Sequence, residues 1–222
     1  MSLRPTRIGS PLAGLLSRLA LAPRQEHGAL TLWPLVLRDV SDLAPDAGAG
    51  VPEIVPLADA QAAGTARVVD VGPGGIGPQV RVENDGGEAV LVLFGEVLRC
   101  GTQQRVANAS FLVRGRSALV IDAACVGREP WVRRPGTHFA AGGAVASQAL
   151  RRKMAPKVAT ARLALGRFVA DQREVWDEVA ARLARAHVEG PAAGFAELRS
   201  AHTVAMDALA AHFHPLVGQL GF

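Results

Sequence analysis

The sequence predicts an α+β fold in which a mostly antiparallel sheet or sandwich is followed by helices that pack on it. Short β-like runs separated by turn signals fill residues 29–126, and helical periodicity fills residues 145–222. Runs of strands that precede runs of helices are typical of α+β proteins. At 222 residues the chain can bury a large core, so we expect it to need no disulfide or metal for stability.

Residues 1–28 are predicted to form a short helix and a lead-in to a single domain over residues 29–222. The leucines of this segment share a helical spacing: Leu12, Leu15, Leu16 and Leu19. Arg18 interrupts the apolar stretch, which favours an amphipathic helix over a signal peptide. No uncharged apolar run reaches the roughly 18 residues of a membrane-spanning helix. We therefore expect a cytoplasmic protein without a membrane partner.

The first strand is expected over residues 29–37, where Pro34 indicates an edge position or a bulge. A loop rich in Asp, Gly and Pro follows, then a short helix over residues 57–64 and a strand over 66–71. The glycine-rich segment 72–78 lacks the Lys-Ser/Thr ending of a phosphate-binding P-loop, so we expect a turn there.

Two hairpins are predicted next, which brings the count to about six or seven strands. The first turn is "NDGG" at residues 84–87, because Asn, Asp and Gly can adopt the positive φ angles of a tight hairpin. The second turn is "RGRS" at residues 114–117, between β-like runs at 105–113 and 118–126.

Residues 127–144 are predicted to be a long connector, because Gly, Pro and Arg interrupt any periodicity there. One helix is expected over residues 172–185, and "EGP" at 189–191 ends it. A single last helix is expected to follow with one apolar stripe: Phe195, Leu198, His202, Met206, Leu209 and Phe213.

The net charge of +4 conceals an uneven distribution. Residues 99–185 contain 16 Arg and Lys against 6 Asp and Glu, whereas the rest of the chain is acidic. Such a basic part can attract phosphates, nucleotides or RNA, and the alternative is a solvated helix face. No block of five like charges exists, so nucleic acid is the weaker candidate partner.

A dense group of polar side chains follows the apolar run "AVLVLF", within "GEVLRCGTQQRVANASFLV" at residues 95–113. Arg105 can bind a phosphate through two hydrogen bonds, while Gln104 and Asn108 offer paired donors and acceptors. Glu96 can accept from hydroxyl groups, or act as a general base. The alternative is a structural ion pair between Glu96 and Arg105, which would contribute only about 0–1 kcal/mol if exposed.

The predicted connector adds Arg128, Trp131 and Arg133 as candidate ligand-binding residues. A Trp with Arg neighbours can stack on a base or hold a phosphate. The alternative role of Trp131 is to anchor the connector over the sheet.

Metal and thiol chemistry find little support in the sequence. Cys100 and Cys125 are too few for a zinc site or a disulfide framework, and Cys125 ends an apolar run that is typical of a buried strand. His212 and His214 lack a nearby third ligand. We therefore expect no metal site, and the sequence indicates no particular cofactor.

The strings "GEVLRCGTQQRVANASFLV", "CVGREPW", "SQALRRK" and "DQREVWDEV" together resemble a largely uncharacterised prokaryotic family. It is the ADP-ribosylglycohydrolase and rhodanese-phosphatase associated protein domain, an ARPP-type domain, and the resemblance covers roughly residues 30–186. One departure is that Gly127 stands where a Glu is expected, with Glu129 two places later, which weakens an enzymatic role for that Glu. The matching residues are Gly95, Glu96, Gly101, Gln103, Gln104, Arg105, Asn108, Cys125, Trp131, Leu150, Arg151, Gln172 and Trp176.

The resemblance implies a role in the metabolism of NAD-derived or ADP-ribosylated nucleotides, or in a bacterial stress response that uses them. The first hypothesis is a domain that binds an anionic, nucleotide-type ligand such as ADP-ribose. The second is a hydrolase or transferase with Glu96 as its general base. The third is a protein-interaction module that docks through its C-terminal helix. The sequence leaves open the ligand, the enzymatic status and the oligomeric state.

Overall fold

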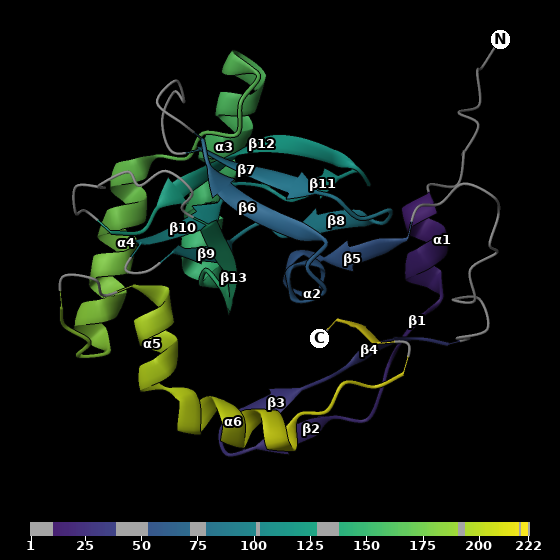
Figure 1. Ribbon diagram of the computed structural model, residues 1–222. Helices are drawn as coiled ribbons and strands as arrows, with labels where there is room; N and C mark the ends of the chain where they lie inside the picture. The colour runs from purple at the N-terminus through teal and green to yellow at the C-terminus, as the bar shows by residue number, and fades with distance from the viewer. Residues whose placement is uncertain are drawn as a thin grey trace, which may run out of the picture. The chain divides into compact units, whose positions relative to one another are not determined.

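The computed structural model describes residues 11–38, 53–71, 79–100, 103–127, 138–190, 194–217 and 219–221 (Figure 1). The chain divides into two compact units, one of residues 52–201 and one of residues 1–51 with 202–222. Among the described residues, strands precede most of the helices and every strand pair but one is antiparallel, so the α+β class is confirmed. The division at residue 28 that the sequence suggested stays a prediction.

The larger unit is built on a closed barrel of six antiparallel strands. Going around the barrel, the order is β10, β12, β7, β6, β13 and β9. The strands are β6 (Ala66–Asp70), β7 (Gln79–Asn84), β9 (Glu96–Cys100), β10 (Gln103–Ala107), β12 (Ser117–Cys125) and β13 (His138–Val145). Because side chains alternate along a strand, each strand sends one set into the barrel and the other set outward.

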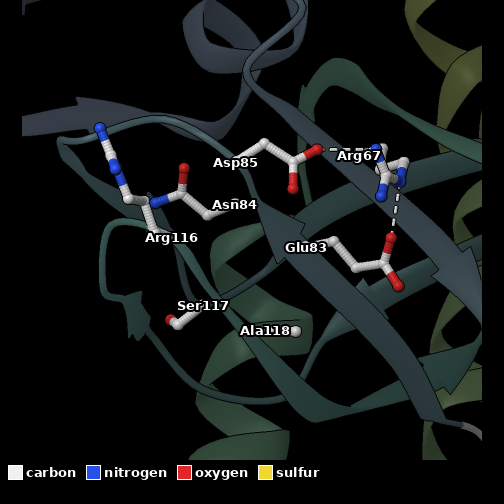
Figure 2. A pocket seen from close by; sticks show the side chains of 7 residues that line it. All are labelled: Arg67, Glu83, Asn84, Asp85, Arg116, Ser117 and Ala118. Carbon is white, nitrogen blue, oxygen red and sulfur yellow. Dashed lines mark hydrogen bonds and ion pairs between the residues drawn. The ribbon is translucent and has the colours of Figure 1, made fainter.

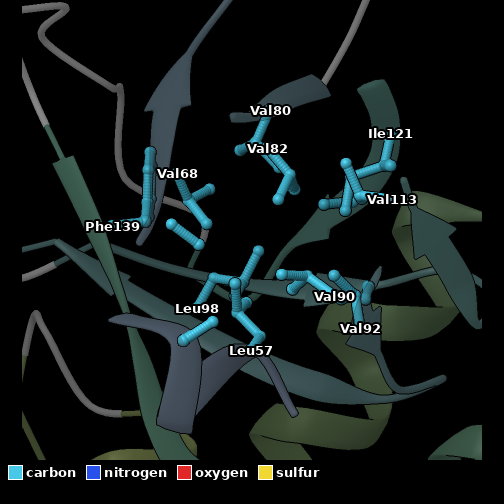
Figure 3. Close-up of a cluster of buried hydrophobic side chains, with 14 residues drawn as sticks. Leu57, Val68, Val80, Val82, Val90, Val92, Leu98, Val113, Ile121 and Phe139 are labelled. Atoms are coloured by element: carbon cyan, nitrogen blue, oxygen red, sulfur yellow. The ribbon is translucent and has the colours of Figure 1, made fainter. Parts of the chain in front are cut away.

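The barrel interior is a continuous apolar core, which Figure 3 shows. The strands contribute side chains such as Val68, Val82 and Leu98, and each is fully buried. Helix α2 (Leu57–Ala62) adds Leu57, which is also fully buried. A small sheet completes this core: β5 (Ile54–Pro56), β8 (Ala89–Val92) and β11 (Phe111–Val113). Each buried Val or Leu contributes about 1.5–3 kcal/mol to the free energy of unfolding.

Three helices cover the outer face of β9, β10 and β12: α3 (Gln148–Leu165), α4 (Gln172–Arg185) and α5 (Phe195–Ala201). They form a second apolar core, in which Leu150 and Val175 pack against Val97 and Val106 of the barrel. The Ser147 hydroxyl accepts a hydrogen bond from the third residue of α3, as a helix N-cap does. The prediction that C-terminal helices pack on the sheet is therefore confirmed.

The hairpin predicted at "NDGG" is wrong. Strand β7 pairs with β6 and β12, whereas β8 pairs with β11 and β5. The cause is Asn84, whose side chain is buried at 2% exposure. Its Nδ2 donates to the carbonyls of Glu88, Val113 and Arg114, and its Oδ1 accepts from the Gly86 amide. These bonds fix a corner that carries the chain into the small sheet.

The second predicted pair is confirmed for part of its length. Residues 105–107 of β10 pair with 123–125 of β12. Residues 111–113 instead form β11 and pair with β8. The two strands separate after Asn108, whose side chain bonds to the backbone in place of continued pairing.

Residues 138–144, expected as part of the connector, form strand β13 together with Val145, which was expected to begin the helical part. Its sequence "HFAAGGAV" shows no clear alternation, because Phe139 is its one large side chain inside the barrel. Pairing with β6 covers only two residues. Beyond them Gln61 of α2 takes over: its Nε2 donates to the Phe139 carbonyl at 2.8 Å, and its Oε1 accepts from the Ala141 amide at 2.7 Å. The glycine-rich segment 72–78 lies outside the described residues.

The smaller unit contains short strands and two helices. A three-stranded sheet and a hairpin are present. The elements are α1 (Pro11–Ser17), β1 (Leu19–Leu21), β2 (Gln25–His27), β3 (Leu30–Leu32), β4 (Leu35–Leu37), α6 (Thr203–His212) and β14 (Gln219–Gly221). Pro34 divides the strand predicted at 29–37 into β3 and β4. No helix in the described part of the chain has the length and apolar character to span a membrane.

The single last helix that the sequence predicts is two helices, α5 and α6, with a turn at His202. The expected apolar stripe divides with it. Phe195 belongs to the second apolar core at 6% exposure, whereas Met206 of α6 is 54% exposed. The stripe therefore does not form one continuous docking surface.

Candidate functional site

Strand β10, the centre of the polar motif, sends its side chains to two opposite faces of the barrel wall. Val106 packs in the core beneath the helices, and Ala107 packs in the core inside the barrel. By alternation Gln104 faces outward with Val106, and Arg105 faces inward with Ala107. The candidate residues therefore do not form one surface.

Gln104 connects the barrel wall to α5. Its side chain is buried, and its Nε2 lies 2.5 Å from Glu197 Oε2. The other oxygen of Glu197 lies 3.5 Å from Arg99 Nη2. A Cβ on Gly194 would lie only 2.7 Å from Gln104 Nε2, so a larger residue where the chain enters α5 would force the Gln104 amide to move.

Asn108 fixes the segment between α3 and α4. Its Oδ1 accepts from the Ala124 amide at 3.0 Å, and its Nδ2 donates to the Phe168 carbonyl at 2.8 Å. Asp122 lies on the same outer face and accepts from the Phe168 amide at 2.9 Å and from Arg167 Nη2 at 2.5 Å. Both side chains are buried, so these polar bonds compensate for the loss of contact with water.

Glu96 closes the turn before β9. Its Oε2 accepts from the Leu93 amide at 2.9 Å. Burial raises the pKa of the Glu96 carboxyl above its ordinary value, and the bond from Leu93 opposes that shift. The structural pair with Arg105 that the sequence left open is not formed between these two described residues, since Arg105 pairs with Asp70 instead.

Arg105 lies inside one end of the barrel at 4% exposure. Its Nη1 donates to the Gln79 carbonyl at 2.7 Å, and its Nη2 lies 3.2 Å from Asp70 Oδ1. The guanidinium carbon lies 5.2 Å from the centre of the Phe139 ring. Cys125 is the cross-strand partner of Arg105. We call Asp70, Gln79, Arg105 and Cys125 the barrel end; each comes from a different strand.

The charges of the barrel end act on the Cys125 thiol in opposite directions. Burial raises the pKa of Cys125, the Arg105 guanidinium lowers it, and the Asp70 carboxylate raises it. The net shift is upward, so the thiol is protonated at neutral pH and is a poor nucleophile.

Two residues of α4 hold the strand that carries Cys125. Gln172 Oε1 accepts from the Cys125 amide at 2.9 Å, and its Nε2 donates to the Cys125 carbonyl at 2.6 Å. Trp176 Nε1 donates to the Gly127 carbonyl at 3.0 Å. The sequence did not indicate this contact.

The family model of the ARG and Rhodanese-Phosphatase-superfamily-associated Protein domain, ARPP-1, matches residues 18–222. The chain belongs to the ARPP-1 family. The resemblance seen in the motifs is thereby confirmed. No curated protein and no solved structure gives a significant match.

Two of the residues that link this ARPP-1 chain to its family, Gly95 and Arg151, lie against each other. Gly95 has a φ of 86°, and a Cβ there would lie 2.5 Å from Arg151 Cδ, so the Arg151 stem packs directly across this glycine. Three predicted ligand-binding residues, Arg128, Trp131 and Arg133, lie outside the described residues.

Asp70 of the ARPP-1 barrel end was missed by the sequence reasoning. The signal was present, because Asp70 lies two residues after Val68 on the inward side of "ARVVD". An acidic residue at an inward position near a strand end is stabilised by a buried cation or by hydrogen bonds, so it indicates a polar partner inside the barrel.

A groove opens on the ARPP-1 barrel away from Arg105, with a volume of about 270 Å³ (Figure 2). Arg67 is one of its lining residues, and its Nε lies 2.6 Å from Glu83 Oε2 while its Nη1 lies 2.7 Å from Asp85 Oδ2. Its carboxylates are thus already engaged by a cation of the same surface. The lining residues are Arg67, Glu83, Asn84, Asp85, Arg116, Ser117 and Ala118. Within the described residues no cluster of three or more metal-ligating side chains occurs.

Proposed function

We propose that this ARPP-1 chain binds an anionic, nucleotide-type ligand, such as ADP-ribose or another NAD-derived compound, at the barrel end. The observation that carries the proposal is the buried Arg105 guanidinium, held by Asp70 and by the Gln79 carbonyl. Buried charges are expensive, so ionisable groups retained inside a domain mark candidate functional sites. The planar guanidinium also matches the geometry of a phosphate.

Two further facts support this proposal. The basic part of the sequence, residues 99–185, includes Arg105 and the whole of β12, which pairs with the strand of Arg105. The family name associates the domain with ARG and rhodanese-phosphatase superfamily proteins. On sequence grounds we propose Arg128, Trp131 and Arg133 as further ligand contacts, and the cytoplasm as the location.

Binding can be tested by thermal shift and calorimetry with ADP-ribose, NAD, ATP and a short RNA. Binding to the native state must raise the melting temperature, and a ligand at 100 times its Kd adds about 2.7 kcal/mol. The variant R105M/D70N removes both buried charges together and should lose most of the affinity. The matched control is R116M, which removes an exposed Arg on the groove of Figure 2.

Two results would reject nucleotide binding at the barrel end. One is that none of the nucleotides stabilises the native protein. The other is that R105M/D70N binds as tightly as the unmodified chain, which would place the ligand elsewhere.

A second candidate function is a hydrolase or transferase that uses Glu96 as general base. The half-buried carboxyl with a raised pKa favours it, because a general base works best with a pKa closer to neutral. The variant E96Q should then abolish turnover of an ADP-ribose conjugate and leave the melting temperature nearly unchanged. Full activity of E96Q would exclude this role.

A further inference from the structure

The ion pair of the barrel end is buried on both sides. The side chains of Arg105 and Asp70 are 4% and 8% exposed, and their closest atoms lie 3.2 Å apart. Arg105 also has contacts that do not depend on Asp70, namely the Gln79 carbonyl and the Phe139 ring. The guanidinium therefore keeps part of its anchoring if the carboxylate leaves.

An anionic ligand that reaches this site meets a pair with no net charge. The Asp70 carboxylate occupies the same kind of position on the guanidinium that a phosphate or carboxylate oxygen of a ligand would take. Strand pairing fixes the backbone of Asp70, which lies opposite Val80 of β7, and so keeps its carboxylate close to Arg105. The chain itself thus supplies a competitor for any ligand anion.

We propose that Asp70 sets the affinity and selectivity of the barrel end, and that the ligand binds by replacing the Asp70 carboxylate on Arg105. This inference rests on the proposed function. A ligand with one carboxylate gains nothing over the carboxylate already present. A diphosphate carries more negative charge and more acceptor oxygens, so it can displace Asp70. The site therefore selects diphosphate-containing compounds over simple carboxylates.

Cys125 provides a reporter of this charge balance that needs no ligand. Its thiol feels both partners, because Asp70 raises and Arg105 lowers its pKa. Removing the Asp70 charge should lower the pKa of Cys125 and increase its rate of alkylation. Removing the Arg105 charge should have the opposite effect. The sequence contains only Cys100 and Cys125, so a C100S background leaves one thiol to follow.

The experiment compares D70N, R105M and R105M/D70N in the C100S background. Iodoacetamide alkylation is followed between pH 6 and 9, values chosen around the ordinary Cys pKa of about 8.5, and calorimetry measures ADP-ribose, pyrophosphate and acetate. We expect D70N to react faster and to bind ADP-ribose and pyrophosphate about 5- to 150-fold more tightly, the usual range of a coupling between two sites. Acetate should bind to D70N and not to the unmodified chain.

Folding of each variant is checked by circular dichroism, and Asp70→Ser replaces D70N if the latter does not fold. Unchanged or weaker binding by D70N, with ADP-ribose still bound by the unmodified chain, would overturn the inference and leave the proposed function standing. If neither chain binds any anion, the proposed function fails and the inference falls with it. The alkylation rates then still show whether Asp70 and Arg105 oppose each other at Cys125.

Discussion

The outer and inner faces of the β10 wall use polar side chains for different purposes. On the outer face, Gln104 and Asn108 are neutral amides that bind α5 and the segment between α3 and α4. On the inner face, Arg105 brings a charge into the barrel and pairs it with Asp70. Amides fasten elements at low electrostatic cost, whereas a buried ion pair is costly to form and to break. One polar motif thus serves the fold on one face and a candidate site on the other.

The largest difference between the faces should appear when one member of the ion pair is removed. We expect R105M to lower the free energy of unfolding by about 3–5 kcal/mol, because it takes the Arg105 charge away from the buried Asp70 carboxylate. The double variant R105M/D70N should regain most of that loss. Urea denaturation of the two variants measures both values. Equal losses in the single and double variants would show that the two charges are not coupled.

On the outer face the expected loss is smaller. The variant N108A leaves the Ala124 amide and the Phe168 carbonyl without their side-chain partner. Each unsatisfied buried group costs about 1–3 kcal/mol, so we expect a loss of roughly 2–4 kcal/mol. Thr160→Ala on the exposed side of α3 is the control and should stay within about 0.5 kcal/mol. A loss in N108A no larger than in this control would mean that Asn108 does not fasten the segment.

Further from β10, an ion pair connects α4 to α3: Lys153 Nζ lies 2.7 Å from Glu178 Oε2. The hydrogen bond from Lys153 lowers the pKa of Glu178 despite its burial. We expect E178Q to cost about 1 kcal/mol at pH 7, a modest value because Lys153 is exposed. Because folding lowers the pKa of Glu178, its ionised carboxylate stabilises the folded protein at pH values above the ordinary Glu pKa of about 4.3. This stabilisation is lost as the pH falls further, through the pKa that the group has in the folded state. Thermal unfolding should therefore show a lower melting temperature for E178Q than for the unmodified chain at pH 7, and equal melting temperatures in acid.

The smallest change in the free energy of unfolding is expected for E96Q, and it should be a gain where the other variants show a loss. Its pKa is raised by burial, so the charged form is disfavoured in the folded state. The contribution of Glu96 to the free energy of unfolding is therefore fully present at pH values below the ordinary Glu pKa. It is lost as the pH rises through the pKa that the group has in the folded state. Because Gln can still accept from the Leu93 amide, E96Q should be equally stable or up to about 1 kcal/mol more stable at pH 7. A clear loss of stability at pH 7 would contradict this sign.

Local periodicity was enough to predict many elements, and strand pairing was not. The alternation in "QVRVEN" predicts β7, because burial of every second side chain is a local property. The partner of β7 depends on Asn84, which bonds to carbonyls about 30 positions later in the chain. Strand β13 escaped prediction because its Ala and Gly residues carry little periodic signal.

The candidate site was predictable only in part for a similar reason. The polarity after an apolar strand indicated Gln104, Arg105 and Asn108 as ligand-binding residues, which stays a prediction. In the structure each of them has a partner within the chain. Which of them faces the barrel interior follows from closure of the sheet, which no single segment encodes. Asp70 went unnoticed because it ends an otherwise ordinary strand, and only its distance to Arg105 gives it significance.

The glutamines that bond to backbone have a consequence for solubility. Gln61 occupies a carbonyl and an amide of β13 where pairing with β6 stops, and Gln172 does the same at Cys125 of β12. Unpaired strand groups are templates on which a second chain can add a strand. Each glutamine acts as a one-residue substitute for the missing strand. Its loss would leave a carbonyl and an amide without a partner at the place where pairing between two barrel strands stops, and such a gap is where a second chain can pair. These side chains therefore protect against self-association as well as connecting elements.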